Sequence, residues 1–306
     1  MKKFVLVDGN AIMHRAYYAM PRFKTNGKLV NAIYGFISIL FSAIEKFEPE
    51  YLAIAFDVKG PTFRDELFKE YKAKRVKAPD EFYAQIPEIW EFVKKMEIPL
   101  LVKERFEADD VIGTIAKRIN KQTQNLEIVI LTGDQDTLQL VNDRIKVAMP
   151  KMGRVKEAVY DKLAVFGRFG LAPEQIIDYK ALSGDSSDNI PGVGGIGEKT
   201  ATALLKEYGS LEQIYQNLEK DEKTFLQKFG QLVAKKLKEG KVVAELSKKL
   251  ATIKTDIDLD FKLSQAKIRD FDEEVVRNFL RKYHFKSLVK RLPKSVRING
   301  QQEQLF

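Results

Sequence analysis

The sequence has 306 residues, 44% of them hydrophobic, so it is long enough for one large domain or two small ones, each with its own core. It has no Cys and two His, which excludes disulfides, a thiol nucleophile, and metal sites built on thiolates or several His. The net charge of +9 favours a polyanionic partner. Because no stretch approaches the ~18 consecutive apolar residues of a membrane span, we expect a cytoplasmic protein that does not enter a membrane.

Short apolar runs alternate with helical patterns in the first half of the chain. The runs are residues 4–7, 51–56, 99–102 and 128–131. Together with the helical periodicity of residues 32–47, they predict a parallel sheet covered by helices, an α/β core over residues 1–160. Three of the runs end at or near Asp8, Asp57 and Asp134. Since ligands bind at the carboxyl ends of parallel strands, we expect these acids to meet at one edge of the sheet.

The second half of the chain has a different composition. After about residue 160 the strand-like runs end, and the sequence becomes helical and richer in Lys. We therefore predict an all-helical subdomain over residues 161–296. Residues 297–306 lack periodicity and are expected to form a flexible tail.

An acidic cluster precedes the helical segment that begins at Val111. It contains Glu107, Asp109 and Asp110 within four residues. One or two of these acids could simply cap the helix, which would explain Asp109 or Asp110 alone. Three adjacent carboxylates repel one another, so the whole cluster indicates that cations bind there.

Two further acidic pairs follow along the chain. Asp134 and Asp136 come after a buried strand, and taken alone this pair is better explained as a cap on the next helix. Asp185 and Asp188 are three residues apart, a spacing that places them on one face if the segment is helical.

With almost no His and no Cys, these acids offer only oxygen ligands, which select hard cations such as Mg²⁺ or Mn²⁺. Two such ions ~3.5–4 Å apart would hold the attacking and leaving oxygens of a phosphodiester. The acidic set therefore indicates a metal-dependent phosphodiester hydrolase.

A glycine-rich turn at residues 190–200 opens a helix. Its glycines let the backbone approach a phosphate, and the free N–H groups of a helix start favour an anion, to which Lys199 adds charge. A dinucleotide-binding turn would have to follow a strand, whereas residues 176–183 have a helical pattern. A tight interhelical turn would not need four glycines. A helix-hairpin-helix that holds the DNA backbone fits better.

A basic segment with an aromatic residue lies between the second predicted strand and the next helix, near residues 60–84. Tyr71 stands among Lys72, Arg75 and further lysines. Aromatic rings among cations suit single strands, because bases stack on the rings while Lys and Arg contact phosphates. Such a run is more often a solvated helix face. Its position beside the acidic edge favours the nucleic-acid interpretation.

Taken together, these motifs resemble the 5′ nuclease family of 5′-3′ exonucleases and flap endonucleases over roughly residues 1–290. The motifs occur in the family's order. They are Val7-Asp8-Gly9-Asn10, Ala55-Phe56-Asp57, Phe63-Arg64 with Tyr71-Lys72 and Arg75, Glu107-Ala108-Asp109-Asp110, Thr132-Gly133-Asp134-Gln135-Asp136, and the run from Gly184 to Val193. The similarity is greatest to the N-terminal domain of bacterial DNA polymerase I. It implies a PIN-like core with a helical arch and a helix-3-turn-helix motif.

The resemblance also implies roles for individual residues. The metal ligands would be Asp8, Asp57, Glu107, Asp109, Asp110, Asp134, Asp136, Asp185 and Asp188. Lys72 and Arg75 would act on the scissile phosphate, Tyr71 would stack on a frayed base, and Arg15 and Lys180 would contact phosphates. The hairpin, through Gly192, Gly195, Gly197 and Lys199, would hold duplex DNA, with a K⁺ ion bound by backbone carbonyls.

The implied activity is structure-specific cleavage of DNA with a 5′ flap or frayed 5′ end, including an RNA primer, by two-metal catalysis in replication and repair. A haloacid-dehalogenase-like phosphatase would need a second acid at Asn10, and a DNA-binding module without catalysis would be expected to lack some acids or Lys72. A stand-alone nuclease and the excised N-terminal domain of a DNA polymerase I remain alternatives.

The chain ends in a short motif of its own. Gln302, followed three residues later by Leu305 and Phe306, resembles the peptide by which bacterial replication proteins dock on a sliding clamp. The alternative is a leftover interdomain linker. We treat clamp binding by this tail as a hypothesis.

Overall fold

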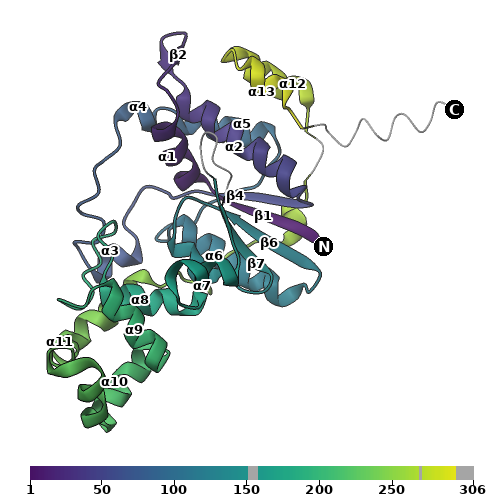
Figure 1. Cartoon of the computed structure of the whole chain (residues 1–306). Coiled ribbons are helices and arrows are strands. Elements are labelled where there is room, and N and C mark those ends of the chain that lie inside the picture. The colour runs from purple at the N-terminus through teal and green to yellow at the C-terminus, as the bar shows by residue number, and fades with distance from the viewer. Residues whose placement is uncertain (151–157, 269–270, 294–306) are drawn as a thin grey trace.

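A mixed sheet forms the centre of the computed structural model, which describes residues 1–150, 158–268 and 271–293 (Figure 1). Within these residues it has six strands in the order β5-β4-β1-β6-β7-β8. Their bounds are β1 Lys2–Asp8, β4 Tyr51–Ala55, β5 Leu100–Leu101, β6 Leu126–Leu131, β7 Ile145–Met149 and β8 Ala158–Tyr160. All neighbours pair in parallel except β8, which is antiparallel to β7 at the edge. The predicted α/β class is confirmed.

Helices cover both faces of the sheet. In the first half of the chain they are α1 Gly9–Ala19, α2 Asn31–Phe47, α3 Phe63–Leu67, α4 Asp80–Tyr83, α5 Ile86–Lys95, α6 Ala108–Gln122 and the short η1 Asp136–Leu140. Alternate residues of β1 serve different cores. Val5 and Val7 pack with α1, α2 and α5, whereas Phe4 and Leu6 pack with α6. A small hairpin, β2 Lys24–Thr25 and β3 Lys28–Leu29, projects from the α1–α2 connection (Figure 1).

The helices after the sheet form a second body with a core of its own. They are α7 Lys162–Phe169, η2 Pro173–Gln175, α8 Ile176–Ser183, α9 Glu198–Tyr208, α10 Leu211–Lys220 and α11 Glu222–Ala251. Leu204, Ile214 and Leu237 are among the residues buried in this core. The long α11 is kinked at Gly230, whose backbone is not helical. In Figure 1, α9, α10 and α11 extend away from the sheet.

The chain then returns to the first body. This return differs from the prediction of one continuous helical subdomain over residues 161–296. The last elements are η3 Leu263–Ala266, α12 Glu273–Lys282 and α13 Lys286–Lys290. Ile257 and Phe261 lie in the core under α6, and Phe279 contacts Phe92 of α5. The apolar face of α12 is thus buried against α5 rather than against the other helices of the second half.

Within the described ranges, the structure contains no helix with the length and apolar content that a membrane crossing requires.

Candidate active site

The carboxyl ends of β1, β4 and β6 bring three acids to one edge of the sheet, as the strand pattern predicts. Asp8 ends β1 and caps the N-terminus of α1, where its Oδ1 accepts from the N–H of Ala11 (2.9 Å). Its Oδ2 accepts from the hydroxyl of Thr132 (2.7 Å), which follows β6. Asp57, after β4, accepts from the N–H of Ala108 at the start of α6 (2.7 Å). These bonds join the strand ends to the two helices around them.

Asp109 and Asp110 are neighbours at the start of α6, but their surroundings differ. Asp110 is fully buried and forms a bidentate ion pair with Arg64 at 2.8 and 2.9 Å. Its two oxygens also accept from the N–H groups of Lys254 (2.8 Å) and Glu107 (3.1 Å). In this structure the Asp110 carboxylate is therefore occupied by protein donors and does not line the cleft, whereas Asp109 does, and the role of Asp110 as a metal ligand stays a prediction.

Three carboxyl groups in this edge are protonated more easily than usual. Burial, together with the charges of Asp57 and Asp134, raises the pKa of Asp8 to about 7. Burial and then the charges of the neighbouring acids raise the pKa of Asp109 well above its usual value. Burial raises the pKa of Asp134 as well. Raised pKa values mean that these carboxylates lack sufficient positive charge around them.

A second acidic group is neutralised by Lys180 of α8. Its Nζ is bonded to Asp136 and lies 2.6 Å from Asp185. Burial alone would raise the pKa of Asp185, but the charge and hydrogen bond of Lys180, with bonds from Ser187, lower that pKa to about 2. The predicted phosphate contact Lys180 is therefore held between two predicted metal ligands.

The predicted arch supplies further cations. Between Leu67 and Asp80 it forms turns and irregular chain, so the expected helix is confined to its ends in α3 and α4. Lys72 donates to Glu107 (2.6 Å), and Arg75 is paired with Asp188. In Figure 1 the segment runs beside the helical body and up to α4.

Tyr71 does not lie where the sequence suggested. Its side chain is buried with Ile190 and Leu250, and its hydroxyl donates to Asp188 (3.2 Å) and Glu107 (3.3 Å). A ring buried in this cluster cannot stack on a frayed base without leaving this position. The expectation for Tyr71 is corrected: the residue holds two acids of the site.

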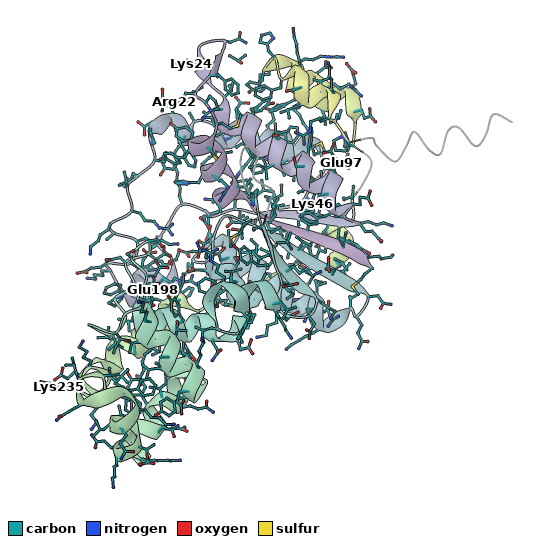
Figure 2. All side chains as sticks on the ribbon, viewed as in Figure 1. Arg22, Lys24, Lys46, Glu97, Glu198 and Lys235 are labelled. Carbon is teal, nitrogen blue, oxygen red and sulfur yellow. The ribbon has the colours of Figure 1, made fainter. Side chains whose placement is uncertain are left out.

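These groups share one cleft of about 1510 Å³. It is lined by Arg15, by Lys72, Arg75 and Lys180, and by the predicted metal ligands other than Asp110 and Asp188. Glu198, at the first position of α9, also lines it and lies where the helical body meets the core (Figure 2). In this arrangement no three Asp, Glu or His side chains of the described ranges are close enough to hold one metal ion together.

The glycine-rich turn divides into a buried and an open part. Gly192 is buried, and a Cβ there would lie 2.2 Å from the backbone N of Gly184. Gly192 is therefore required for packing, which corrects its assignment as a DNA contact. Gly195, Gly197 and Lys199 are exposed, and the carbonyl of Gly195 accepts from Lys236 (3.0 Å).

Two residues that matter in this geometry were not assigned a role from the sequence. Arg64 pairs with Asp110, and Asn10 accepts from the N–H of Asp57 through its Oδ1 (3.1 Å). Arg64 belongs to the motif Phe63-Arg64, and Asn10 belongs to the motif Val7-Asp8-Gly9-Asn10. Their presence in these motifs is the sequence feature that could have indicated a role. The tail residues Gln302, Leu305 and Phe306 lie outside the described residues.

Two family models match the chain. The one described as 5'-3' exonuclease, N-terminal resolvase-like domain, matches residues 3–170, and the one described as 5'-3' exonuclease, C-terminal SAM fold, matches residues 171–274. The chain belongs to the 5′-3′ exonuclease family, a family of nucleases.

Its relatives fall into two kinds. The 5'-3' exonuclease of Aquifex aeolicus is 38% identical over 307 residues, which cover 100% of both chains. The DNA polymerase I of Caldicellulosiruptor bescii is 42% identical over 293 residues, which cover 95% of this chain and 33% of the polymerase. The chain thus spans about a third of the length of the polymerases that it matches.

Solved structures share the fold. The T5 5'-exonuclease with bound zinc has a TM-score of 0.68 at 20% identity, covering 95% of this chain and 97% of that one. The catalytic core of Rad2 in complex with DNA substrate has a TM-score of 0.60 at 17% identity, covering 95% and 91%.

Proposed function

We propose that this chain hydrolyses DNA near the junction between a 5′ single strand and a duplex, as a flap endonuclease and 5′-3′ exonuclease. The observation that carries the proposal is the shared cleft. It combines acids with raised pKa values, cations on the arch and on α8, and the neighbouring hairpin with exposed glycines. The cations would hold and neutralise the phosphate, the acids would hold the metal ions that activate the attacking water, and the hairpin would hold the duplex beside them.

The donor set suits two hard divalent cations such as Mg²⁺ or Mn²⁺, since it contains carboxylates only. Asp8, Asp109 and Asp134 would hold one ion, with Asp57 and Glu107 beside them, once their side chains move closer together than in this arrangement. Asp136, Asp185 and Asp188 would hold the other. When bound, two ions supply an activated water and charge neutralisation at the scissile phosphate. The raised pKa values support the first position.

The second position requires an exchange of partners. Lys180 and Arg75 occupy the carboxylates of Asp136, Asp185 and Asp188 in this structure. A cation bound there would release both side chains, whose charges would then be free to contact the scissile phosphate. Lys72, now paired with Glu107, would be freed in the same way. These side chains then position and neutralise the phosphate, as does Arg15 at the cleft wall.

The hairpin would hold the duplex part of the substrate. Its exposed glycines and Lys199 present N–H groups and charge to a DNA backbone without reading sequence. The carbonyl of Gly195, which now accepts from Lys236, would be among the ligands of a K⁺ ion.

The relatives support a role in replication and repair, where flaps and primers, including RNA primers, are removed. One relative is named 5'-3' exonuclease and others DNA polymerase I. The alternative, the same activity in the N-terminal part of a DNA polymerase I, is tested by sequencing the gene beyond the codon of Phe306.

The activity itself is tested with a 5′-labelled flap duplex, incubated with and without Mg²⁺ and sized on a gel. We expect cleavage near the junction that leaves a 5′-phosphate and a 3′-hydroxyl and that stops in excess EDTA. Undiminished cleavage in EDTA would contradict the proposal. An intact flap at every Mg²⁺ concentration would contradict it equally.

A further inference from the structure

The loop of residues 185–190 is closed by its own hydrogen bonds. The N–H of Asp185 donates to the carbonyl of Ile190 (2.9 Å), and the N–H of Ile190 donates back (2.8 Å). Asn189 has a left-handed backbone with φ of 57°, a conformation that Asn tolerates better than most residues. The loop carries Asp185 and Asp188, so its position sets the place of two acids of the cleft.

The arch is fastened to this loop at three points. The N–H of Lys72 donates to the carbonyl of Asp188 (2.9 Å). The side-chain amide of Asn189 donates to the carbonyl of Glu70 (2.7 Å), and Arg75 Nε donates to the carbonyl of Ser187 (3.3 Å). Of the two side chains that make these bonds, Arg75 is also paired with Asp188, whereas the amide of Asn189, which lines the cleft too, reaches the arch through the carbonyl of Glu70.

Lys72 depends on this support. Its backbone is also left-handed, with φ of 54°, which residues with a Cβ rarely adopt unless their surroundings hold them there. The conformation is fixed from both sides, by the bond of its own N–H to Asp188 and by the bond of Asn189 to Glu70 two residues earlier. Losing the second bond would let Lys72 turn to a more common conformation and move its ammonium group.

The same loop continues directly into the glycine-rich hairpin. Gly192 packs against the backbone of Gly184, which precedes the loop, and the N–H of Val193 donates to the carbonyl of Leu182 (2.8 Å). Both ends of the loop are therefore bonded or packed against the hairpin, so the loop and the hairpin cannot shift independently. A duplex on the hairpin would fix the loop, and the loop would fix the arch.

We propose that Asn189 is a positioning residue that connects the duplex-binding hairpin to Lys72 and so aligns Lys72 with the scissile phosphate. The inference rests on the proposed function. Asn189 touches neither DNA nor metal in this role. It acts through the carbonyl of Glu70 and the conformation of Lys72, so its removal slows cleavage of bound DNA without weakening the binding of DNA.

The test compares two variants with a matched control. Asn189→Gly removes the amide and tolerates the left-handed backbone, and Asn189→Asp keeps the shape but replaces the donor with an acceptor. Both should slow single-turnover cleavage of a flap by about tenfold, while the Kd for the flap in EDTA stays within about twofold of the parent. The control Glu70→Ala keeps the backbone carbonyl and should cleave at the parental rate.

A double variant separates positioning from a general loss of structure. In a Lys72→Ala background, Asn189→Gly should slow cleavage by less than about twofold, because the group that it positions is gone. Parental rates in both single variants would overturn the proposal, as would an equal tenfold loss in the Lys72→Ala background. If the parent enzyme leaves the flap intact, the proposed function is refuted instead. The lane of the same gel that contains the parent enzyme reports this outcome.

Discussion

The acidic cleft and the glycine-rich hairpin both serve DNA in the proposed function, but they hold their charges in opposite ways. In the cleft, Lys72, Arg75 and Lys180 are each paired with a carboxylate. On the hairpin, Lys199 is exposed, and within the described part of the chain it makes no ion pair. The cleft pairs its Lys and Arg side chains internally, whereas the hairpin leaves Lys199 open to solvent.

The difference predicts where each region acts. The Lys and Arg side chains of the cleft must exchange a protein carboxylate for a phosphate of the substrate. They therefore stabilise mainly the transition state, and their loss lowers the cleavage rate. The hairpin is already formed and open, so its contribution appears in affinity and in the dependence of affinity on salt. Variants in the two regions should therefore separate rate from binding.

The largest effect is expected from Asp134→Asn in the cleft. Asp134 faces Asp8 and Asp109 with a raised pKa, so loss of its charge removes a ligand that the cations need. Single-turnover cleavage of a flap should fall by at least about 10³-fold, while Kd measured in EDTA stays unchanged or decreases. A folded variant that still cuts at the parental rate would remove Asp134 from the site.

The next effect is on folding, and it distinguishes the two neighbours Asp109 and Asp110. Arg64→Ala leaves the fully buried carboxylate of Asp110 without its partner and should lower the free energy of unfolding by about 3 kcal/mol. Asp109→Asn should raise that free energy in metal-free buffer, because burial and repulsion disfavour the Asp109 carboxylate. Urea titrations in EDTA measure both. Equal losses in the two variants would mean that Asp110 is no more structural than Asp109.

Lys72→Ala should slow the chemical step by about 10²-fold and change Kd for the flap by less than about threefold. The matched control is Lys69→Ala, which removes the same charge from an exposed arch position that does not line the cleft. Its rate should stay within about threefold of the parent. Similar losses in the two variants would indicate that the arch acts only through its overall charge.

The sequence predicted those parts of the fold and site that depend on local pattern. Alternating apolar runs predicted β1, β4 and β6, and parallel pairing then placed Asp8, Asp57 and Asp134 at one edge. Strand β7 was missed, because Lys146 interrupts its apolar run.

The rest depends on contacts between distant segments. Arg64 and Asp110 are 46 residues apart, and no spacing rule connects them. Tyr71 is buried because Ile190 and Leu250 cover it, which the basic composition around Tyr71 does not indicate. Likewise, the amphipathic pattern of α12 requires a buried face but does not say that α5 receives it.

The smallest effect is expected on the hairpin, from Lys199→Ala. Lys199 is the second residue of α9, exposed beside Gly197 and outside the cleft lining, so its proposed partner is a phosphate of the duplex. A lost phosphate contact should weaken flap binding severalfold at low salt and lower the slope of log Kd against log salt by about one, since one fewer counterion is released. The rate at saturating enzyme should stay parental.

Glu198→Gln, one residue earlier in the same helix turn, is the contrast, because it removes a negative charge and should tighten binding instead. An unchanged salt slope for Lys199→Ala would show that the open charge of the hairpin does not contact DNA, and the division between the two regions would then fail at the hairpin.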